Sequence, residues 1–133
     1  MRAVDTNVLA RYYLRDDAGQ AGVAAGILSA GDVFVPKTVL LELAWVLRSV
    51  AEQPVQRVLD CIEHLIALPG VHIEDHDQAQ AAVRAARRGM DFADSLHLAA
   101  SHRCTELLTF DDRGYARKAR RLGLTPRVTL ARG

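Results

Sequence analysis

Four acidic residues stand where a folded domain usually places an apolar residue or a helix cap. Two follow short strand-like segments and two interrupt apolar runs: Asp5, Asp111, Glu42 and Asp94. Carboxylates at the ends of buried elements cost free energy unless a cation joins them. Clustered carboxylate oxygens are the ligands that Mg²⁺ and Mn²⁺ prefer. The chemistry that these residues imply is metal-assisted cleavage of phosphodiesters.

Each acid also has a purely structural explanation. Asp5 and Asp94 could be helix N-caps, a role that stabilises a helix by about 1 kcal/mol. Asp111 and the adjacent Asp112 could be turn residues, because the local sequence Asp-Asp-Arg-Gly is suited to a turn. Glu42 interrupts a helix that is apolar nearly all round, which favours a site role over a solvated side chain.

Short polar side chains flank the acids and could orient them by hydrogen bonds, although each could equally be a cap. They are Thr6, Asn7, Ser95 and Thr109. The histidines match no zinc-binding spacing, and we expect most of them at the surface. His97, one turn after Asp94, is not expected to be catalytic.

The composition indicates one ordinary globular domain. The chain has 133 residues, of which 50% are hydrophobic and 25% charged, enough to bury a core. The net charge of +1 neither requires nor excludes a nucleic acid partner. Arginine, the better phosphate ligand, dominates a basic cluster near the C-terminus that could also be a solvated helix face. The cluster comprises Arg113, Arg117, Lys118, Arg120 and Arg121.

Cysteine usage and hydropathy favour a soluble cytoplasmic protein. Cys61 and Cys104 form no paired motif, and the opening residues do not resemble a secretory signal. No apolar stretch approaches the roughly 20 residues needed to span a bilayer, so no membrane partner is expected.

Strand-like and helix-like segments alternate, which is typical of a parallel sheet covered by helices on both faces. The sequence predicts strands at about 2–4, 32–35, 71–73, 106–110 and 127–130. It predicts helices at about 6–14, 16–30, 38–50, 54–68, 75–88, 94–103 and 113–121. No linker or repeat interrupts this order, so we expect a single domain over residues 1–133. Because ligands bind beyond the carboxyl ends of parallel strands, one pocket could collect all four acids.

The segments that carry the acids resemble those of PIN-domain ribonucleases, specifically the VapC-type toxins of bacterial toxin–antitoxin pairs. The resemblance covers essentially the whole chain. It implies an α/β fold, a flavodoxin-like three-layer α/β/α sandwich with a central, mostly parallel sheet. The matching segments are Val4-Asp5-Thr6-Asn7-Val8-Leu9, Leu40-Leu41-Glu42-Leu43, Asp91-Phe92-Ala93-Asp94-Ser95-Leu96-His97-Leu98-Ala99 and Leu108-Thr109-Phe110-Asp111.

The resemblance also implies a Mg²⁺- or Mn²⁺-dependent endoribonuclease. Asp5, Glu42, Asp94 and Asp111 match the acidic site of the family, which would hold one or two ions, with Asp112 and Asp91 as alternative ligands. Hydrolysis by an activated water would leave 5′-phosphate and 3′-hydroxyl ends. The basic cluster then becomes a candidate for steering the RNA backbone.

Partners are implied as well. Toxins of this kind are typically homodimers silenced by an antitoxin, which lays a helical tail into an apolar groove. Such a groove could come from Val8, Leu9, Tyr12, Tyr13 and Leu14 with the Ala-rich stretch 18–30, unless these residues simply form core.

The sequence is also compatible with two other functions. A degenerate PIN-like fold could bind RNA or protein without cutting, although idle clustered carboxylates would destabilise it. A phosphatase could use Asp5 as its nucleophile, but such sites usually place a second acid two residues later, where this chain has Asn7. They also want a nearby lysine, and the chain has only Lys37 and Lys118.

Overall fold

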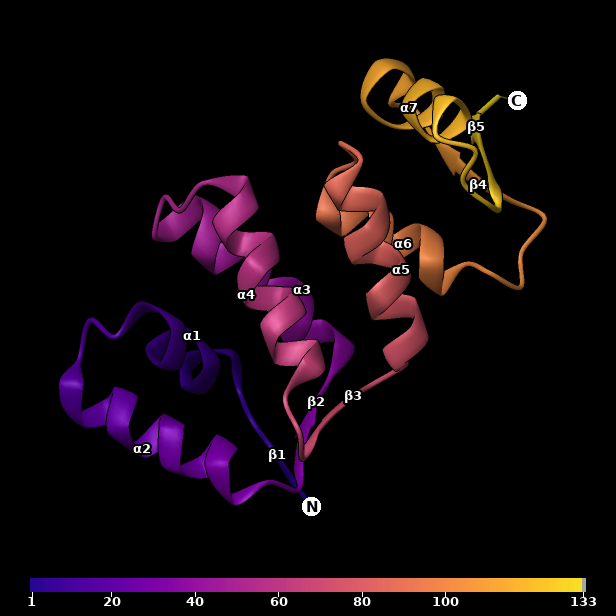
Figure 1. Ribbon diagram of the computed structural model, residues 1–133. Helices are drawn as coiled ribbons and strands as arrows, with labels where there is room; N and C mark the ends of the chain where they lie inside the picture. The colour runs from indigo at the N-terminus through magenta and orange to yellow at the C-terminus, as the bar shows by residue number, and fades with distance from the viewer. Residues whose placement is uncertain (133) are drawn as a thin grey trace. The chain divides into compact units, whose positions relative to one another are not determined.

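Strands and helices alternate along the chain in the computed structural model, which describes residues 1–132 (Figure 1). The elements pack into two units, a first part (residues 1–76) and a second part (from residue 77 onward). Every strand pairing within each part is parallel. The predicted α/β class with parallel strands is therefore confirmed, while the prediction of a single domain stays a prediction.

The first part alternates three short strands with helices. Its strands are β1 (Arg2–Ala3), β2 (Val33–Val35) and β3 (Val71–Ile73). Its helices are α1 (Thr6–Leu14), α2 (Ala18–Ala30), α3 (Lys37–Trp45) and α4 (Val55–Ala67), and α3 continues as the π-helical segment η1 (Val46–Val50).

The three strands form one sheet in the order β1-β2-β3. Arg2 lies opposite Val33, and Val33 lies opposite Val71. Side chains alternate between the faces of a strand, and in β3 the valine and isoleucine are buried while His72 between them is exposed. The fully buried side chains around this sheet come mainly from the helices: Leu9, Leu40, Leu43, Leu59, Ile62 and Leu65.

Two glycines allow the turns before β2 and β3 to approach each other closely. Gly31 ends α2 with φ +75°, and Gly70 precedes β3 with φ +79°. A Cβ atom on Gly70 would lie 2.8 Å from Cα of Gly31. Both the backbone conformation and this contact therefore require glycine at position 70.

The second part contains two helix-rich segments around a short sheet. Its helices are α5 (His76–Arg87), α6 (Phe92–Ala100) and α7 (Arg117–Arg121), the last preceded by the π-helical segment η2 (Asp112–Ala116). The strands β4 (Glu106–Thr109) and β5 (Arg127–Leu130) pair in parallel, with Glu106 opposite Arg127. A buried apolar cluster joins these elements: Ala85, Met90, Leu98, Tyr115, Ala116, Ala119 and Val128.

Most element boundaries lie within a few residues of those predicted, and one difference concerns a site residue. Helix α6 begins at Phe92 rather than at Asp94, because Asp91 is the N-cap: its Oδ2 accepts a hydrogen bond of 3.0 Å from the backbone N–H of Asp94. Asp94 therefore lies inside the first turn of α6.

The predicted helix 38–50 also differs, since it changes to π-helical hydrogen bonding at Val46. None of the helices formed by residues 1–132 combines the length and apolarity that crossing a lipid bilayer requires.

Candidate active site

Thr6 connects the two acids of the first part. Asp5 follows β1 and caps α1, its Oδ1 accepting a hydrogen bond of 2.8 Å from the backbone N–H of Thr6. The Oγ1 of the buried Thr6 donates a hydrogen bond to Oε1 of Glu42 on α3. Helices α1 and α3 follow the carboxyl ends of the neighbouring parallel strands β1 and β2, where a ligand site is expected. One residue thus holds two carboxylates at this edge.

Both carboxylates keep an oxygen for a further ligand. Among residues 1–132, no hydrogen bond occupies Oδ2 of Asp5 or Oε2 of Glu42. Both side chains are exposed, although Glu42 lies within an apolar run of the sequence. The reason is that Glu42 lies near the strand ends on the open side of α3, while Leu40 and Leu43 turn to the core.

Sequence reasoning missed three residues at the same edge of the sheet. The Nζ of Lys37 lies 2.7 Å from Oδ2 of Asp75, and the backbone N–H of Lys37 donates a 2.7 Å hydrogen bond to Oε1 of Glu74. All three lie within two residues of the end of β2 or β3 in the chain, which is the signal that would have identified them. The ion pair between Lys37 and Asp75 offsets charge close to the strand ends.

Asp94 is the half-buried acid of the second part. Burial raises the pKa of its carboxyl above the ordinary value, and the negative charge of Asp91 raises this pKa further. His97 opposes the shift, Asp111 adds to it, and Lys118 opposes it. The negative charges of Asp91 and Asp111 thus disfavour the ionised form of Asp94, an effect that binding of a cation to Asp94 would relieve.

Asp111 follows β4 and caps η2. Its Oδ1 accepts a 2.9 Å hydrogen bond from the backbone N–H of Gly114. The adjacent Asp112 is instead held by Arg117, whose Nε and Nη2 lie 2.9 and 2.6 Å from the same Oδ2. This guanidinium lowers the pKa of Asp112. Of the two neighbouring acids, Asp111 is therefore the one without a cationic partner among residues 1–132.

The predicted orienting residues differ in what they contact. Thr6 binds a carboxylate directly, as described above. Thr109 Oγ1 accepts a 3.0 Å hydrogen bond from the backbone N–H of Asp111, and the buried Ser95 donates one of 2.7 Å to the backbone carbonyl of Asp91. Asn7 is exposed and lines a groove on α1. Tyr115 was not among the predicted residues, although its hydroxyl donates a hydrogen bond to the backbone carbonyl of Asp94.

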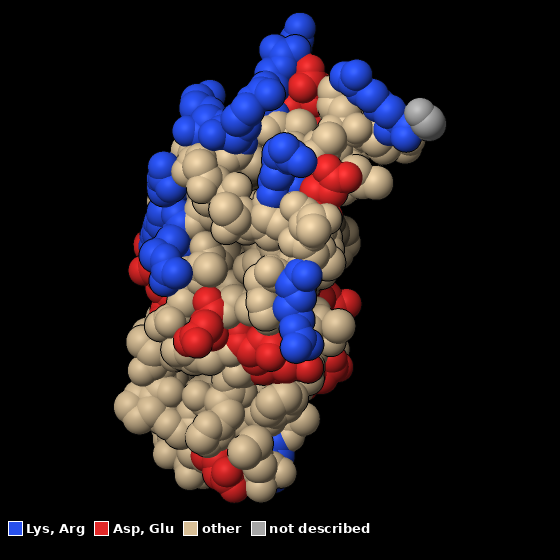
Figure 2. Space-filling view, turned by 90° about the vertical axis from the view of Figure 1, so that its right-hand side faces the viewer, with Lys and Arg blue, Asp and Glu red and all other residues tan. Residues whose placement is uncertain are grey.

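The basic cluster is only partly available for phosphate. Arg117 is engaged by Asp112, and Lys118 Nζ donates a 3.0 Å hydrogen bond to the backbone carbonyl of Gly89. The exposed members without an ion pair among residues 1–132 are Arg113, Arg120 and Arg121. Figure 2 shows exposed Lys and Arg side chains (blue) at the end of the view where Figure 1 draws α7 and β5, since the two views differ only by a turn about the vertical axis.

A groove of about 310 Å³ lies between α1 and α2. Its apolar lining includes Val8, Val23 and Ile27, and Val23 is 65% exposed. Of the residues considered for such a groove, Leu9 is core instead, and the hydroxyl of Tyr13 lies 2.9 Å from Nδ1 of His64. The groove therefore involves fewer residues than the sequence suggested.

The donor chemistry fits a hard divalent cation. Within neither part do three His, Cys, Asp or Glu side chains of residues 1–132 gather into a metal-binding group. Each part nevertheless supplies carboxylates beyond a strand end, and all of their unoccupied donor atoms are oxygens, which suits Mg²⁺ and Mn²⁺. The residues present thus fit such an ion.

Parallel strands followed by acidic residues define this chain as an α/β protein with carboxylates after its strand ends. The PIN domain family matches residues 2–121 of the chain. The chain therefore belongs to the PIN domain family, whose members are generally metal-dependent nucleases that bind RNA. No curated protein matches the chain.

Proposed function

We propose that this chain is a Mg²⁺- or Mn²⁺-dependent endoribonuclease. The observation that carries the proposal is the double role of Thr6, which holds Asp5 by its backbone N–H and Glu42 by its hydroxyl. Thr6 thus fixes two carboxylates after adjacent strand ends, and one oxygen of each carries no hydrogen bond among residues 1–132. Oxygen atoms held in this way are the donors that a hard divalent cation prefers, which gives the arrangement a functional reason.

The proposed ligands of one or two ions are Asp5, Glu42, Asp94 and Asp111, with Asp91 and Asp112 as alternatives. A bound Mg²⁺ or Mn²⁺ supplies Lewis-acid chemistry, polarising the scissile phosphate and lowering the pKa of the attacking water. Thr6 keeps Glu42 and Asp5 oriented throughout. The exposed arginines of the basic cluster bind the RNA backbone electrostatically. The products are 5′-phosphate and 3′-hydroxyl ends.

The first test is cleavage of total cellular RNA by the purified protein with Mg²⁺ or Mn²⁺, with the ends mapped by sequencing. Cleavage should disappear in EDTA and in the Asp5→Asn variant. Asp17→Asn is the matched control, because Asp17 is also an exposed N-cap, accepting a 3.0 Å hydrogen bond from Gln20, but lies away from the strand ends. Equal activity of wild type and Asp5→Asn would contradict the proposal.

Metal binding separates a nuclease from a protein that only binds RNA or other proteins. An ion present at 100 times its dissociation constant raises the free energy of unfolding by about 2.7 kcal/mol. Wild type and Asp17→Asn should both show this rise, and Asp5→Asn should show a smaller one. Metal stabilisation without RNA cleavage would identify the binding module, and hydrolysis of a generic phosphomonoester would identify the phosphatase.

We further propose that the nuclease is the toxin of a toxin–antitoxin pair in the cytoplasm, forming a homodimer. The groove between α1 and α2 supports this proposal, because the exposed Val23 and the half-buried Ile27 suit the apolar face of an antitoxin helix. Induction in bacteria should arrest growth with wild type but not with Asp5→Asn, and co-expression of the neighbouring gene should restore growth.

The groove itself is tested by two matched valine substitutions. Val23→Glu should weaken the complex with the neighbouring gene product, whereas Val50→Glu should not, since Val50 is equally exposed at 63% but lies in η1. Equal complexes from both variants would place the antitoxin elsewhere. Sedimentation of the free protein tests the homodimer.

A further inference from the structure

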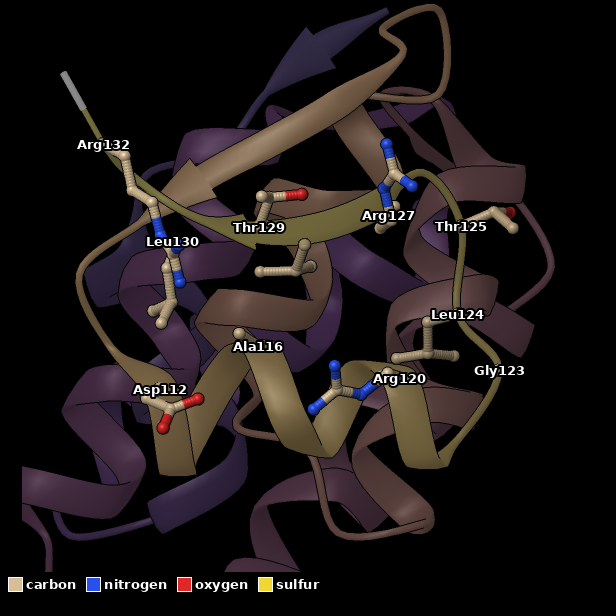
Figure 3. Close-up of a pocket in the computed structure, with 11 residues that line it drawn as sticks. Asp112, Ala116, Arg120, Gly123, Leu124, Thr125, Arg127, Thr129, Leu130 and Arg132 are labelled. Atoms are coloured by element: carbon tan, nitrogen blue, oxygen red, sulfur yellow. The ribbon is translucent and has the colours of Figure 1, made fainter.

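A second hollow lies in the second part between η2, α7 and β5 (Figure 3). Its volume of about 690 Å³ is within the usual range for binding sites. Apolar side chains contribute most of its surface, among them Ala116, Leu124, Val128 and Leu130. Three arginines also line it: Arg120, Arg127 and Arg132. Of the residues that line it, only Asp112 is an alternative ligand of the proposed metal site, and only Arg120 belongs to the basic cluster.

The strand β5 presents an unpaired edge beside this hollow. Among residues 1–132, β5 pairs only with β4. The backbone N–H of Ala131 donates a 2.8 Å hydrogen bond to the backbone carbonyl of Thr109. The backbone N–H and C=O groups of every second residue before it, Thr129 and Arg127, therefore also face β4. Because backbone direction alternates along a strand, Val128 and Leu130 direct their N–H and C=O groups to the opposite edge. Such an edge is a template for another strand.

The hollow carries an excess of positive charge. Its one acid, Asp112, is neutralised by Arg117 at 2.6 Å. Arg127 lies 3.9 Å from Glu106, a loose and largely exposed pair. Neither Arg120 nor Arg132 has an ion-pair partner in the part of the chain that the structure describes.

We propose that this edge binds an extended, acidic segment of a partner protein as an additional strand next to β5. The free backbone groups of Val128 and Leu130 would supply the hydrogen bonds of the ladder. In Figure 3 the side chain of Leu130 turns to the hollow, whereas that of Arg127 turns to the other face of the strand. Since side chains alternate in an added strand as well, the preferred segment alternates apolar with acidic residues.

The combination of features favours a polypeptide over a nucleic acid. A phosphate backbone would use the arginines but has no groups to continue the β ladder. It would also leave the apolar floor of Leu124 and Leu130 exposed to water. An extended acidic peptide would hydrogen-bond to the free edge of β5, cover Leu124 and Leu130, and offset the positive charge of the arginines.

The test is fluorescence anisotropy with a labelled, strand-length peptide of alternating Val and Glu. The probe controls are the same peptide N-methylated at alternate residues, and a labelled oligouridylate of the same length. N-methylation removes ladder donors without changing the protein, and it should weaken binding by at least about tenfold. The protein variant is Arg127→Gln with Arg132→Gln, which should weaken binding by on the order of fivefold. Arg84→Gln, an exposed arginine on α5, is the matched control and should leave binding unchanged.

Three outcomes would overturn the proposal. The first is no binding of the peptide, and the second is equal binding of the N-methylated peptide. The third is binding of the oligouridylate alone, weakened by the double variant, which would make the hollow a nucleic acid site. Circular dichroism confirms that the double variant is folded. RNA cleavage by the double variant should equal that of wild type, so this proposal and the proposed nuclease can fail separately.

Discussion

The hydroxyl of Tyr115 donates a 2.7 Å hydrogen bond to the backbone carbonyl oxygen of Asp94. Tyr115 is buried and belongs to η2, the segment that Asp111 caps, whereas Asp94 lies in the first turn of α6. The bond therefore couples the two segments that carry the acids of the second part. Neither residue type nor spacing in the sequence indicates this contact.

Replacing Tyr115 with Phe should remove this bond while keeping the buried ring. We expect the free energy of unfolding to fall by about 1 kcal/mol, the usual net contribution of a hydrogen bond. RNA cleavage should also slow, because Asp94 loses a constraint on its position. Urea denaturation and a cleavage assay measure the two effects. Tyr12→Phe is the control, since the Tyr12 hydroxyl forms no hydrogen bond among residues 1–132. Equal losses in both variants would show that the bond contributes nothing.

Thr6 offers a test of how Glu42 is held. Thr6→Val keeps the size of the side chain and the backbone N–H to Asp5 but removes the hydroxyl that binds Glu42. Thr6→Ser keeps the hydroxyl. We expect RNA cleavage by Thr6→Val to be slower and to need a higher metal concentration for half-maximal activity. Thr6→Ser should restore both quantities. Activity lost equally in both variants would indicate a packing role for the buried methyl group instead.

The close approach of Gly70 to Gly31 predicts opposite effects of two glycine substitutions. Gly70→Ala should destabilise the protein by about 1–3 kcal/mol, because the new Cβ meets backbone and the positive φ disfavours alanine. Gly26→Ala in α2 meets nothing within 4 Å and should stabilise the helix by up to about 1 kcal/mol. Thermal unfolding compares the two; shifts of the same sign would contradict the prediction.

The two cysteines should differ in reactivity. Cys104 is exposed, whereas Cys61 is buried in α4 and burial raises the pKa of its thiol. Because the thiolate is the reactive form, a disulfide reagent at neutral pH should label only Cys104 in the folded protein. Guanidinium chloride should expose the second thiol. Labelling of native Cys104→Ser would show that Cys61 is more accessible than the structure indicates.

Much of this protein follows from the sequence alone. The strand 71–73, the strand 127–130 and the helix 6–14 lie where local pattern predicts them. Hydrophobic periodicity and chain-breaking glycines act over a few residues, so they can be recognised without knowing the fold. The acids at the strand ends were likewise visible as carboxylates that interrupt or follow apolar segments.

The tertiary structure decided which polar groups pair. It selected Asp91 rather than Asp94 as the cap of α6, engaged Asp112 rather than Asp111 with Arg117, and placed the Thr6 hydroxyl on Glu42. Several partners compete for each of these groups at similar sequence spacing. The competition is settled by which side chains the packed helices bring within about 3 Å of each other, and that distance depends on the fold as a whole rather than on any local pattern.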